Sequence, residues 1–188
     1  MTTKAESFAD QLQIASRYFK GMDAERSFEL LTNDDLARLA EIARDVLRNR
    51  AFRTPIGRNY KDRLIMLALC QGGAQHFVDG VTGVKDLDVW AFFRGGIDKP
   101  FPWRARWSAD FGPSRLGRHS ADEGYLGRRV DVMGRSIPVS DMTGERAVLA
   151  WLNGRSKSAR LLAKRPVIAL FPQALFGKLL WSPPAEQS

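Results

Sequence analysis

Apolar positions in the first fifty residues recur every three or four residues, which predicts two amphipathic helices. The first helix is expected over residues 4–20 and ends at Gly21. The second begins after Thr32 or Asn33, either of which can cap it. Both helices are expected to serve packing. The buried stripe of the second helix comprises Leu36, Leu39, Ala40, Ile42, Ala43, Val46 and Leu47.

Shorter apolar runs further along the chain predict strands. Residues 64–70 are wholly apolar and end at a glycine pair, and residues 85–93 are rich in β-branched and aromatic side chains. Residues 128–133 alternate between polar and apolar positions. Gly134 is expected to turn the chain there into a partner strand over residues 135–140.

The remaining segments complete a mixed pattern. Helices are expected over residues 74–81, 145–152 and 157–164, and a strand over residues 167–171. Residues 94–126 are rich in Gly, Pro, Trp and Arg, show no clean period, and are expected to be a long irregular loop.

These elements predict an α/β or α+β fold, a small mixed sheet flanked by helices. The 188 residues suit a single domain. It is expected to have an N-terminal helical part over 1–60, a central part over 61–141 and a C-terminal helical and strand part over 142–188.

Charge narrows the choice of partners. The formal net charge is +8, which favours nucleic acid, nucleotides or an acidic protein. The charge is uneven, because residues 64–93 carry three aspartates and one lysine, whereas residues 94–129 and 142–188 are strongly basic. An acidic centre between basic stretches is expected where metal cations and a polyanion meet at one site.

Cysteine content and hydropathy bear on the compartment. A lone cysteine, Cys70, excludes an intrachain disulfide framework and a cysteine metal cluster, and it is expected to be buried and inert. No apolar run reaches membrane-spanning length, and the N-terminus lacks the apolar core of a secretory signal. The expectation is a cytoplasmic protein with no membrane partner.

Two motifs in the central part carry chemistry. Gly72 and Gly73 follow a predicted strand and open a predicted helix, where backbone N–H groups can approach phosphate closely. Asp86 and Asp88 are two apart on a predicted strand and therefore face the same side. Two such carboxylates repel unless a cation lies between them, and Mg²⁺ favours carboxylate and phosphate oxygens. The alternative is a surface turn and two solvated aspartates on an edge strand.

A third acid lies within a later apolar run. Asp131 is expected on a strand, where an unpaired acid is unusual. Beside Asp86 and Asp88 it would complete a centre of three carboxylates. The alternative is an ion pair with Arg128 or Arg129.

In this order, the glycine pair, the Asp-Leu-Asp-Val strand and the later acid resemble the DNA polymerase β-like nucleotidyltransferase superfamily, over residues 64–133. The resemblance implies that residues 61–141 are the catalytic core and that Gly72 and Gly73 hold a nucleoside triphosphate. It also implies that Asp86, Asp88 and Asp131 hold two Mg²⁺ ions, with Mn²⁺ as a substitute. Where the superfamily often has a Ser or Thr after the glycines, this chain has Ala74 and Gln75.

Other residues suggest how an acceptor is bound. Trp103, Arg104, Arg106 and Trp107 could stack on bases and hold phosphates, or the tryptophans could instead pin a loop to the body. The basic segment 155–165 is either a nucleic-acid path or a solvated face.

The resemblance therefore implies Mg²⁺-dependent transfer of a nucleoside monophosphate from an NTP to a hydroxyl. RNA, with a tRNA end foremost, is the favoured acceptor, while a protein or small-molecule hydroxyl stays open. The resemblance adds toxin–antitoxin or phage-defence systems as a setting. Because little of the 188-residue chain is left for a large acceptor-binding domain, a dimer or a partner protein is expected to help bind the acceptor. The alternatives are a catalytically degenerate module that senses nucleotides or binds protein, and plain RNA binding through the basic stretches. His76, just after the glycines, is either a phosphate contact or an ordinary helix residue.

Overall fold

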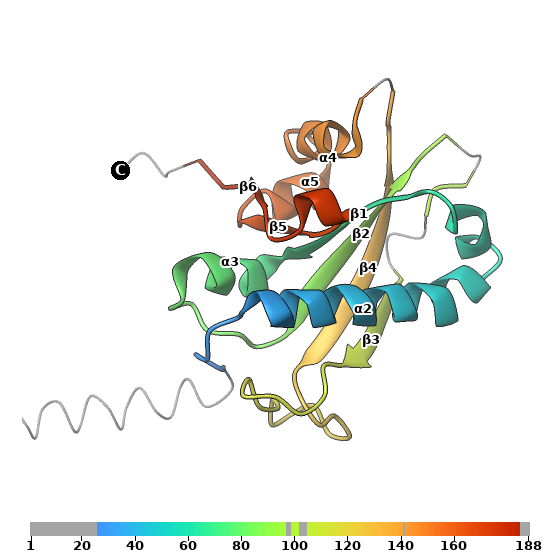
Figure 1. Ribbon diagram of the computed structural model, residues 1–188. Coiled ribbons are helices and arrows are strands. Elements are labelled where there is room, and N and C mark those ends of the chain that lie inside the picture. Colours follow the sequence, from blue (N-terminus) through green and yellow to red (C-terminus); the bar gives the residue numbers. More distant parts are fainter. Residues whose placement is uncertain (1–25, 97–98, 102–104, 141, 185–188) are drawn as a thin grey trace, which may run out of the picture.

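The protein is built on one mixed six-stranded sheet with the strand order β3-β4-β2-β1-β5-β6 (Figure 1). The computed structural model describes residues 26–96, 99–101, 105–140 and 142–184. Strands β2 and β4 are parallel, and the other neighbouring pairs are antiparallel. The strands are β1 (Leu64–Cys70), β2 (Leu87–Arg94), β3 (Arg106–Asp110), β4 (Arg129–Ile137), β5 (Val167–Phe171) and β6 (Leu179–Trp181).

Helices cover both faces of the sheet. On one face α2 (Asn33–Asn49) runs across the strands, with α3 (Gln71–Asp79) beside it, whereas α4 (Gly144–Leu152) and α5 (Lys157–Leu162) pack on the other face. The arrangement is an α+β fold, as the sequence predicted. Short 3-10 helices lie at η1 (Ala51–Arg53), η2 (Gly57–Tyr60) and η3 (Gln173–Leu175).

Side chains alternate between the two faces of the sheet, so that one hydrophobic core forms on each face and each side chain faces a particular set of helices. In β2, Val89 packs in the core under α2, while Trp90 packs in the core under α4 and α5. Because side chains alternate, Asp88 faces the same side as Trp90. Asp131 likewise lies between Val130 and Val132, both of which face the α2 core.

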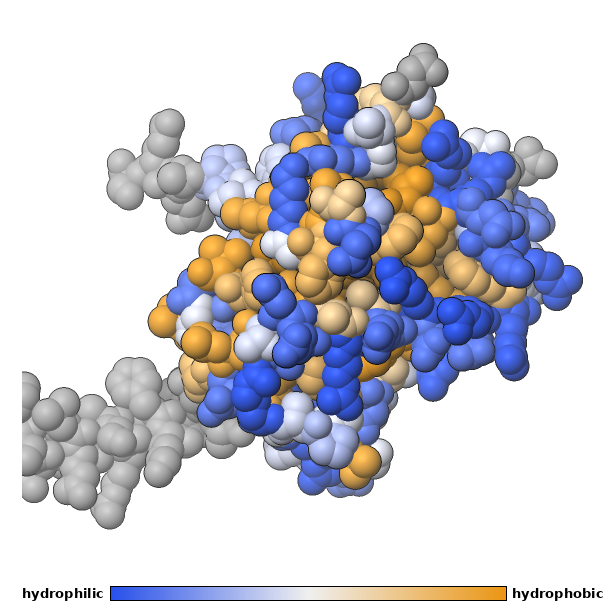
Figure 2. Space-filling view, viewed as in Figure 1, coloured by the Kyte–Doolittle hydropathy of each residue, from blue (hydrophilic) through white to orange (hydrophobic). Residues whose placement is uncertain are grey.

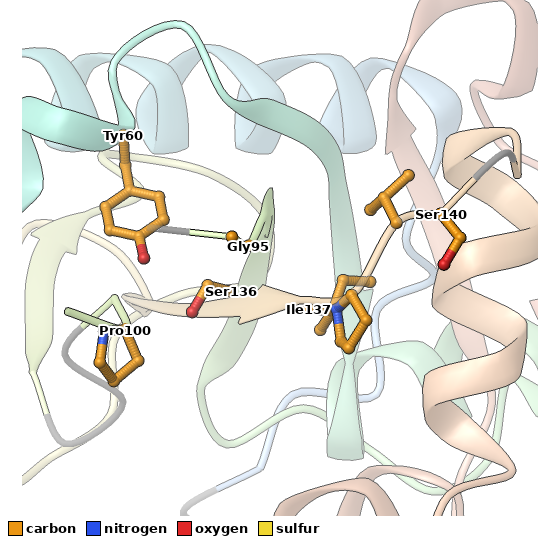
Figure 3. A pocket seen from close by; sticks show the side chains of 9 residues that line it. Tyr60, Gly95, Pro100, Ser136, Ile137 and Ser140 are labelled. Atoms are coloured by element: carbon orange, nitrogen blue, oxygen red, sulfur yellow. The ribbon is translucent and has the colours of Figure 1, made fainter. Parts of the chain in front are cut away.

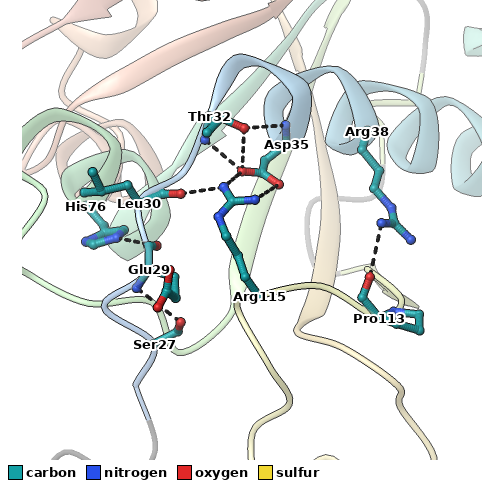
Figure 4. Close-up of polar contacts among 9 residues, drawn as sticks. All are labelled: Ser27, Glu29, Leu30, Thr32, Asp35, Arg38, His76, Pro113 and Arg115. Carbon is teal, nitrogen blue, oxygen red and sulfur yellow. Dashed lines mark hydrogen bonds and ion pairs between the residues drawn. The ribbon is translucent and has the colours of Figure 1, made fainter.

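The start of α2 is fixed by a capping box. Thr32 accepts a hydrogen bond from the Asp35 amide, and the Asp35 carboxylate accepts one from the Thr32 amide at 2.8 Å. The Asp35 carboxylate also pairs with Arg115, and Arg38 of α2 donates to the Pro113 carbonyl (Figure 4). These contacts fasten the loop after β3 to the first turns of α2.

Most elements predicted from the apolar pattern are confirmed. The second helix begins at Asn33 with Thr32 as its cap, and the strands over 64–70 and 167–171 coincide with β1 and β5. The helices expected near 145–152 and 157–164 are α4 and α5. The helix expected over residues 4–20 lies outside the described residues.

The expected turn at Gly134 is wrong, because β4 continues through this residue as one strand. A Cβ at position 134 would come within 2.1 Å of Phe101 Cε1. The glycine therefore serves the close approach of a buried aromatic ring rather than a reversal of the chain.

The expected irregular loop over residues 94–126 is also wrong in part, because it contains β3. This strand pairs antiparallel with β4, and Ser108 lies opposite Asp131. Its five residues alternate in facing, but Gly and Pro on both sides concealed the short period in the sequence.

The surface seen from the α2 side is uneven (Figure 2). Hydrophilic side chains follow α2, and hydrophobic ones gather over α3. Exposed apolar residues of this region include Phe28, Leu30, Val78 and Val81. Among the described residues no helix combines the length and the apolar character needed to cross a membrane.

Candidate functional site

The glycine pair lies in the first turn of α3, directly after β1. Gln71 makes the sharp change of direction with φ of 57°, a left-handed conformation that is uncommon for a residue with a side chain. The N-cap residue, Cys70, provides no side-chain hydrogen bond to the helix. The first amides of α3 are therefore left without a side-chain cap at this end of the sheet.

The two glycines have different surroundings. A Cβ at Gly73 would come within 3.0 Å of Leu69 and 3.3 Å of Leu87, so this glycine lets α3 pack tightly against β1 and β2. A Cβ at Gly72 would meet only the guanidinium of Arg165, at 3.4 Å. Gly72 therefore leaves its backbone open toward a cationic side chain.

The strand register brings the predicted acids to the same end of the sheet. Asp88 lies opposite Asp131 in the parallel pair of β2 and β4, and opposite Cys70 in the antiparallel pair of β1 and β2. Asp86 directly precedes β2. The carboxylates thus meet beside the turn that leads into Gly72.

Two arginines lie among the carboxylates. Arg129 contacts Asp86 at 3.1 Å and Asp131 at 3.3 Å, and Arg106 reaches the same Asp131 oxygen at 3.3 Å. Asp131 is completely buried, and its other carboxylate oxygen accepts a hydrogen bond from Ser108 Oγ at 2.6 Å. The grouping of acids and the ion pair with Arg129 therefore occur together rather than as alternatives.

Arg128 contributes differently from its neighbour. Its side chain donates to the carbonyl oxygens of Leu116 and Lys85. It therefore connects the loop after β3 to the segment before β2.

The surroundings of Asp88 disfavour its ionised form. Burial, followed by the negative charges of Asp86 and Asp131, raises the pKa of Asp88 to about 7, although Arg106 and Arg129 act in the opposite direction. Burial and the nearby Asp88 charge also raise the pKa of the Cys70 thiol well above its ordinary value. Cys70 is buried, as expected, and is held as a neutral thiol.

The donor set suits a hard divalent cation in its chemistry. The ligands would be oxygens, Asp88 shares its surroundings with two further carboxylates, and one buried oxygen of Asp131 accepts no hydrogen bond within the described part of the chain. In the arrangement seen, however, no three His, Cys, Asp or Glu side chains of the described residues are placed to hold a metal ion. Arg106 and Arg129 provide the compensating positive charge instead.

The remaining candidates have distinct positions. Trp107 packs edge-to-face against Phe101 at a ring distance of 5.9 Å, on the α2 side of the sheet, while Arg106 lies on the side of the acids. This contact agrees with the packing alternative for Trp107, and its part in acceptor binding stays a prediction. Trp103 and Arg104 lie outside the described residues.

His76 is a structural residue in this arrangement. It is buried, and its Nε2 lies 3.0 Å from the Glu29 carbonyl (Figure 4). Its Nδ1 accepts a hydrogen bond from the Gly83 amide at 3.2 Å. The Gly83 bond requires an unprotonated Nδ1, so the neutral ring donates to Glu29 through Nε2. His76 therefore ties α3 to the segments before α2 and β2.

A separate pocket of about 400 Å³ lies at the opposite end of β2 and β4 (Figure 3). Its lining includes Tyr60, Pro100 and Ser136, and no Asp, Glu, His, Lys or Arg among the described residues. Asp88 stands at the first part of β2, whereas Gly95 follows its last residue. The pocket is therefore remote from the carboxylates.

Sequence reasoning missed two contributors to the site. Ser108 escaped notice because β3 was hidden in the expected loop, although its spacing from Arg106 predicts that both face the same side of a strand. The position of Arg165 was missed, because the sequence placed this residue only within the basic segment 155–165, and it reaches Gly72 through the pairing of β5 with β1.

Comparison with known proteins found no matching family model, no matching curated protein and no matching solved structure.

Proposed function

We propose that the protein is a Mg²⁺-dependent nucleotidyltransferase that moves a nucleoside monophosphate from an NTP to a hydroxyl, with RNA as the favoured acceptor. The observation that carries the proposal is the register of Asp88 and Asp131, side by side and next to the uncapped first turn of α3. A carboxylate cluster and a phosphate-binding backbone thus share one end of the sheet.

The chain's own residues have separate tasks in this proposal. The amides at Gly72 and Gly73 bind the triphosphate, because an uncapped helix start favours negative charge. Asp86, Asp88 and Asp131 would hold two Mg²⁺ ions, which when bound neutralise charge on the attacking and leaving oxygens. Ser108 orients the Asp131 carboxylate through its 2.6 Å hydrogen bond.

The arginines preserve the charge balance before nucleotide binds. Arg129 bridges Asp86 and Asp131, and Arg106 contacts Asp131 with a side chain that is 57% exposed. Arg106 is therefore placed to turn from the carboxylate to a phosphate of the nucleotide.

A transfer assay tests the proposal. The protein is incubated with Mg²⁺ or Mn²⁺, each α-³²P-labelled NTP in turn, and total RNA or cell lysate. We expect label in RNA with the wild type and at least a hundredfold less with Asp86→Asn/Asp88→Asn. The matched control, Asp34→Asn/Asp62→Asn, removes two exposed aspartates outside the site and should keep wild-type transfer. Equal labelling by the two double variants would refute the assigned roles.

A second candidate function is a nucleotide sensor without turnover. The ion pairs that already neutralise Asp86 and Asp131 favour it. The sensor would be supported, and the enzyme contradicted, if an NTP binds saturably but no pyrophosphate is released when total RNA or cell lysate is added as the acceptor.

A further inference from the structure

A basic surface next to the candidate site is formed by α5 and the turn that follows it. Between residues 146 and 184 the chain has seven basic residues and no acidic one. Of these seven, only Lys178 forms an ion pair among the described residues, with Glu145 at 2.6 Å. The positive charge along α5 is therefore uncompensated locally.

The basic side chains stand between two hollows. Lys157, Arg160 and Lys164 are all exposed and follow one another along α5 and the next turn. Arg160 and Lys164 line both a hollow of about 770 Å³ and a second of about 420 Å³. The Arg160 Nε also donates to the Arg155 carbonyl at 2.9 Å, which restrains its guanidinium.

Apolar side chains accompany the charges. The larger hollow is also lined by Leu152, Trp181 and Pro183, and the smaller by Leu161, which is 52% exposed. The Trp181 indole is fixed by a hydrogen bond from Nε1 to the Ala163 carbonyl at 2.9 Å. Cations beside aromatic and aliphatic surface are the combination that holds phosphates and unpaired bases together.

The surface leads to the glycine turn. Arg165 follows Lys164 directly and brings its guanidinium to 3.4 Å from the position of a Cβ on Gly72. Its side chain makes no hydrogen bond or ion pair with other described residues. From Lys157 to Arg165 the cations therefore form one strip that ends beside the carboxylates.

We infer that the α5 strip, defined as Lys157, Arg160, Lys164 and Arg165, binds single-stranded RNA and directs its end toward Gly72 and the carboxylates. The inference rests on the proposed function, because it identifies the surface that holds the acceptor. A duplex would need the row of charges alone, whereas an unpaired strand also uses the apolar walls of the two hollows.

Binding can be measured without catalysis. Fluorescence anisotropy of a 5′-fluorescein-labelled single-stranded RNA of 20 nucleotides gives Kd between 50 and 200 mM salt. Arg160→Glu/Lys164→Glu should weaken binding at least tenfold. The association constant should also depend less steeply on salt. The negative slope of its logarithm against log salt should become smaller in magnitude by about 1.4, at about 0.7 for each phosphate that no longer pairs with a cation. Circular dichroism confirms folding, and Arg160→Gln/Lys164→Gln provides a milder variant with the same direction of change.

Two controls separate this surface from net charge and from the site. Arg53→Glu/Arg58→Glu reverses two exposed charges around η1 and η2, on the α2 side, and should bind RNA as the wild type does. Asp88→Asn should likewise keep RNA binding. Unchanged affinity in both α5 variants would overturn the inference, as would displacement of the RNA by polyglutamate at equal charge or tighter binding of a duplex.

The inference and the proposed function fail in different ways. Loss of RNA binding in the α5 variants, with no nucleotide transfer by the wild type, would support the RNA-binding surface and contradict the proposed enzymatic function. Transfer to RNA with an unchanged KM for RNA in the α5 variants would support the enzymatic function and contradict the RNA-binding surface.

Discussion

Asp35 illustrates how one buried residue can organise two segments. Burial alone would raise the pKa of Asp35, but hydrogen bonds from Thr32 and Arg115 outweigh burial and hold the pKa below its ordinary value. The carboxylate both caps α2 and anchors the loop that follows β3. Its ionised form is therefore the one that stabilises the fold.

Asp35→Asn should lower the free energy of unfolding by about 1–3 kcal/mol at pH 7, because it removes the charged acceptor of two hydrogen-bonded partners. Since the folded-state pKa is depressed, the stabilisation is complete above the unfolded-state pKa and is lost as pH falls through the folded-state pKa. Urea unfolding of both proteins from pH 2 to 7 checks this. A constant difference across that range would show that the carboxylate charge is not responsible.

Gly134 gives a second test at the residue scale. Gly134→Ala should cost about 1–3 kcal/mol, because its Cβ would overlap Phe101, which is itself stacked on Phe93. Chemical denaturation of Gly134→Ala, Phe101→Leu and the double variant measures the coupling. The double variant should be more stable than the sum of the two single effects, and strict additivity would mean that the two residues do not compete for space.

The strand–turn–helix unit from β1 to α3 is the element on which the proposed function depends. Its two glycines predict opposite responses to the same substitution. Gly73→Ala should destabilise the protein by about 1–2 kcal/mol through contact with Leu69 and Leu87, while Gly72→Ala should be nearly neutral for stability. Thermal unfolding of both variants provides the comparison.

The two substitutions should also separate stability from function. Because a methyl group at position 72 would lie between the backbone and Arg165, Gly72→Ala should weaken nucleotide binding while the fold is kept. If Gly72→Ala proved as unstable as Gly73→Ala, the distinction between an open and a packed glycine would be wrong.

Helices and strands could be predicted from the sequence where neighbouring residues alone determine them. The capping residue Thr32 and the apolar runs of β1 and β5 could be identified, because propensity and burial agree there. The continuous strand through Gly134 could not, because its glycine is explained by Phe101, a residue distant in the sequence. The position of Arg165 beside Gly72 depends in the same way on non-local pairing of strands.

For the candidate acids, too, the sequence predicts local features, whereas their arrangement depends on the fold. The spacing of Asp86 and Asp88 predicts a shared face, and Asp131 was recognised as an unusual acid in an apolar run. Their common position at one end of the sheet follows from the parallel register of β2 and β4. The bridging contacts of Arg129 depend on side-chain geometry that no sequence period encodes.

At the scale of the whole molecule, charge is divided between an acidic centre and a basic surface beside it. Magnesium and a nucleotide should bind the folded state more strongly than the unfolded chain, and so should stabilise it. With Mg²⁺ and a non-hydrolysable NTP at about five times its Kd we expect Tm to rise by about 2–4 °C, which corresponds to about 1 kcal/mol for a domain of this size. Asp86→Asn/Asp88→Asn should show no rise, and an equal rise in this variant would place the nucleotide elsewhere.

Whether the three carboxylates and the glycine turn form one metal and nucleotide site is decided by a crystal structure with Mn²⁺ and a non-hydrolysable NTP at saturating concentration, in which anomalous scattering locates the metal. We expect an anomalous peak bound by Asp88 and Asp131, a triphosphate on the amides of Gly72 and Gly73, and Arg129 displaced from the metal-facing carboxylate oxygens. A nucleotide bound at another place, with Arg129 still bridging Asp86 and Asp131 and no peak between the acids, would contradict this expectation.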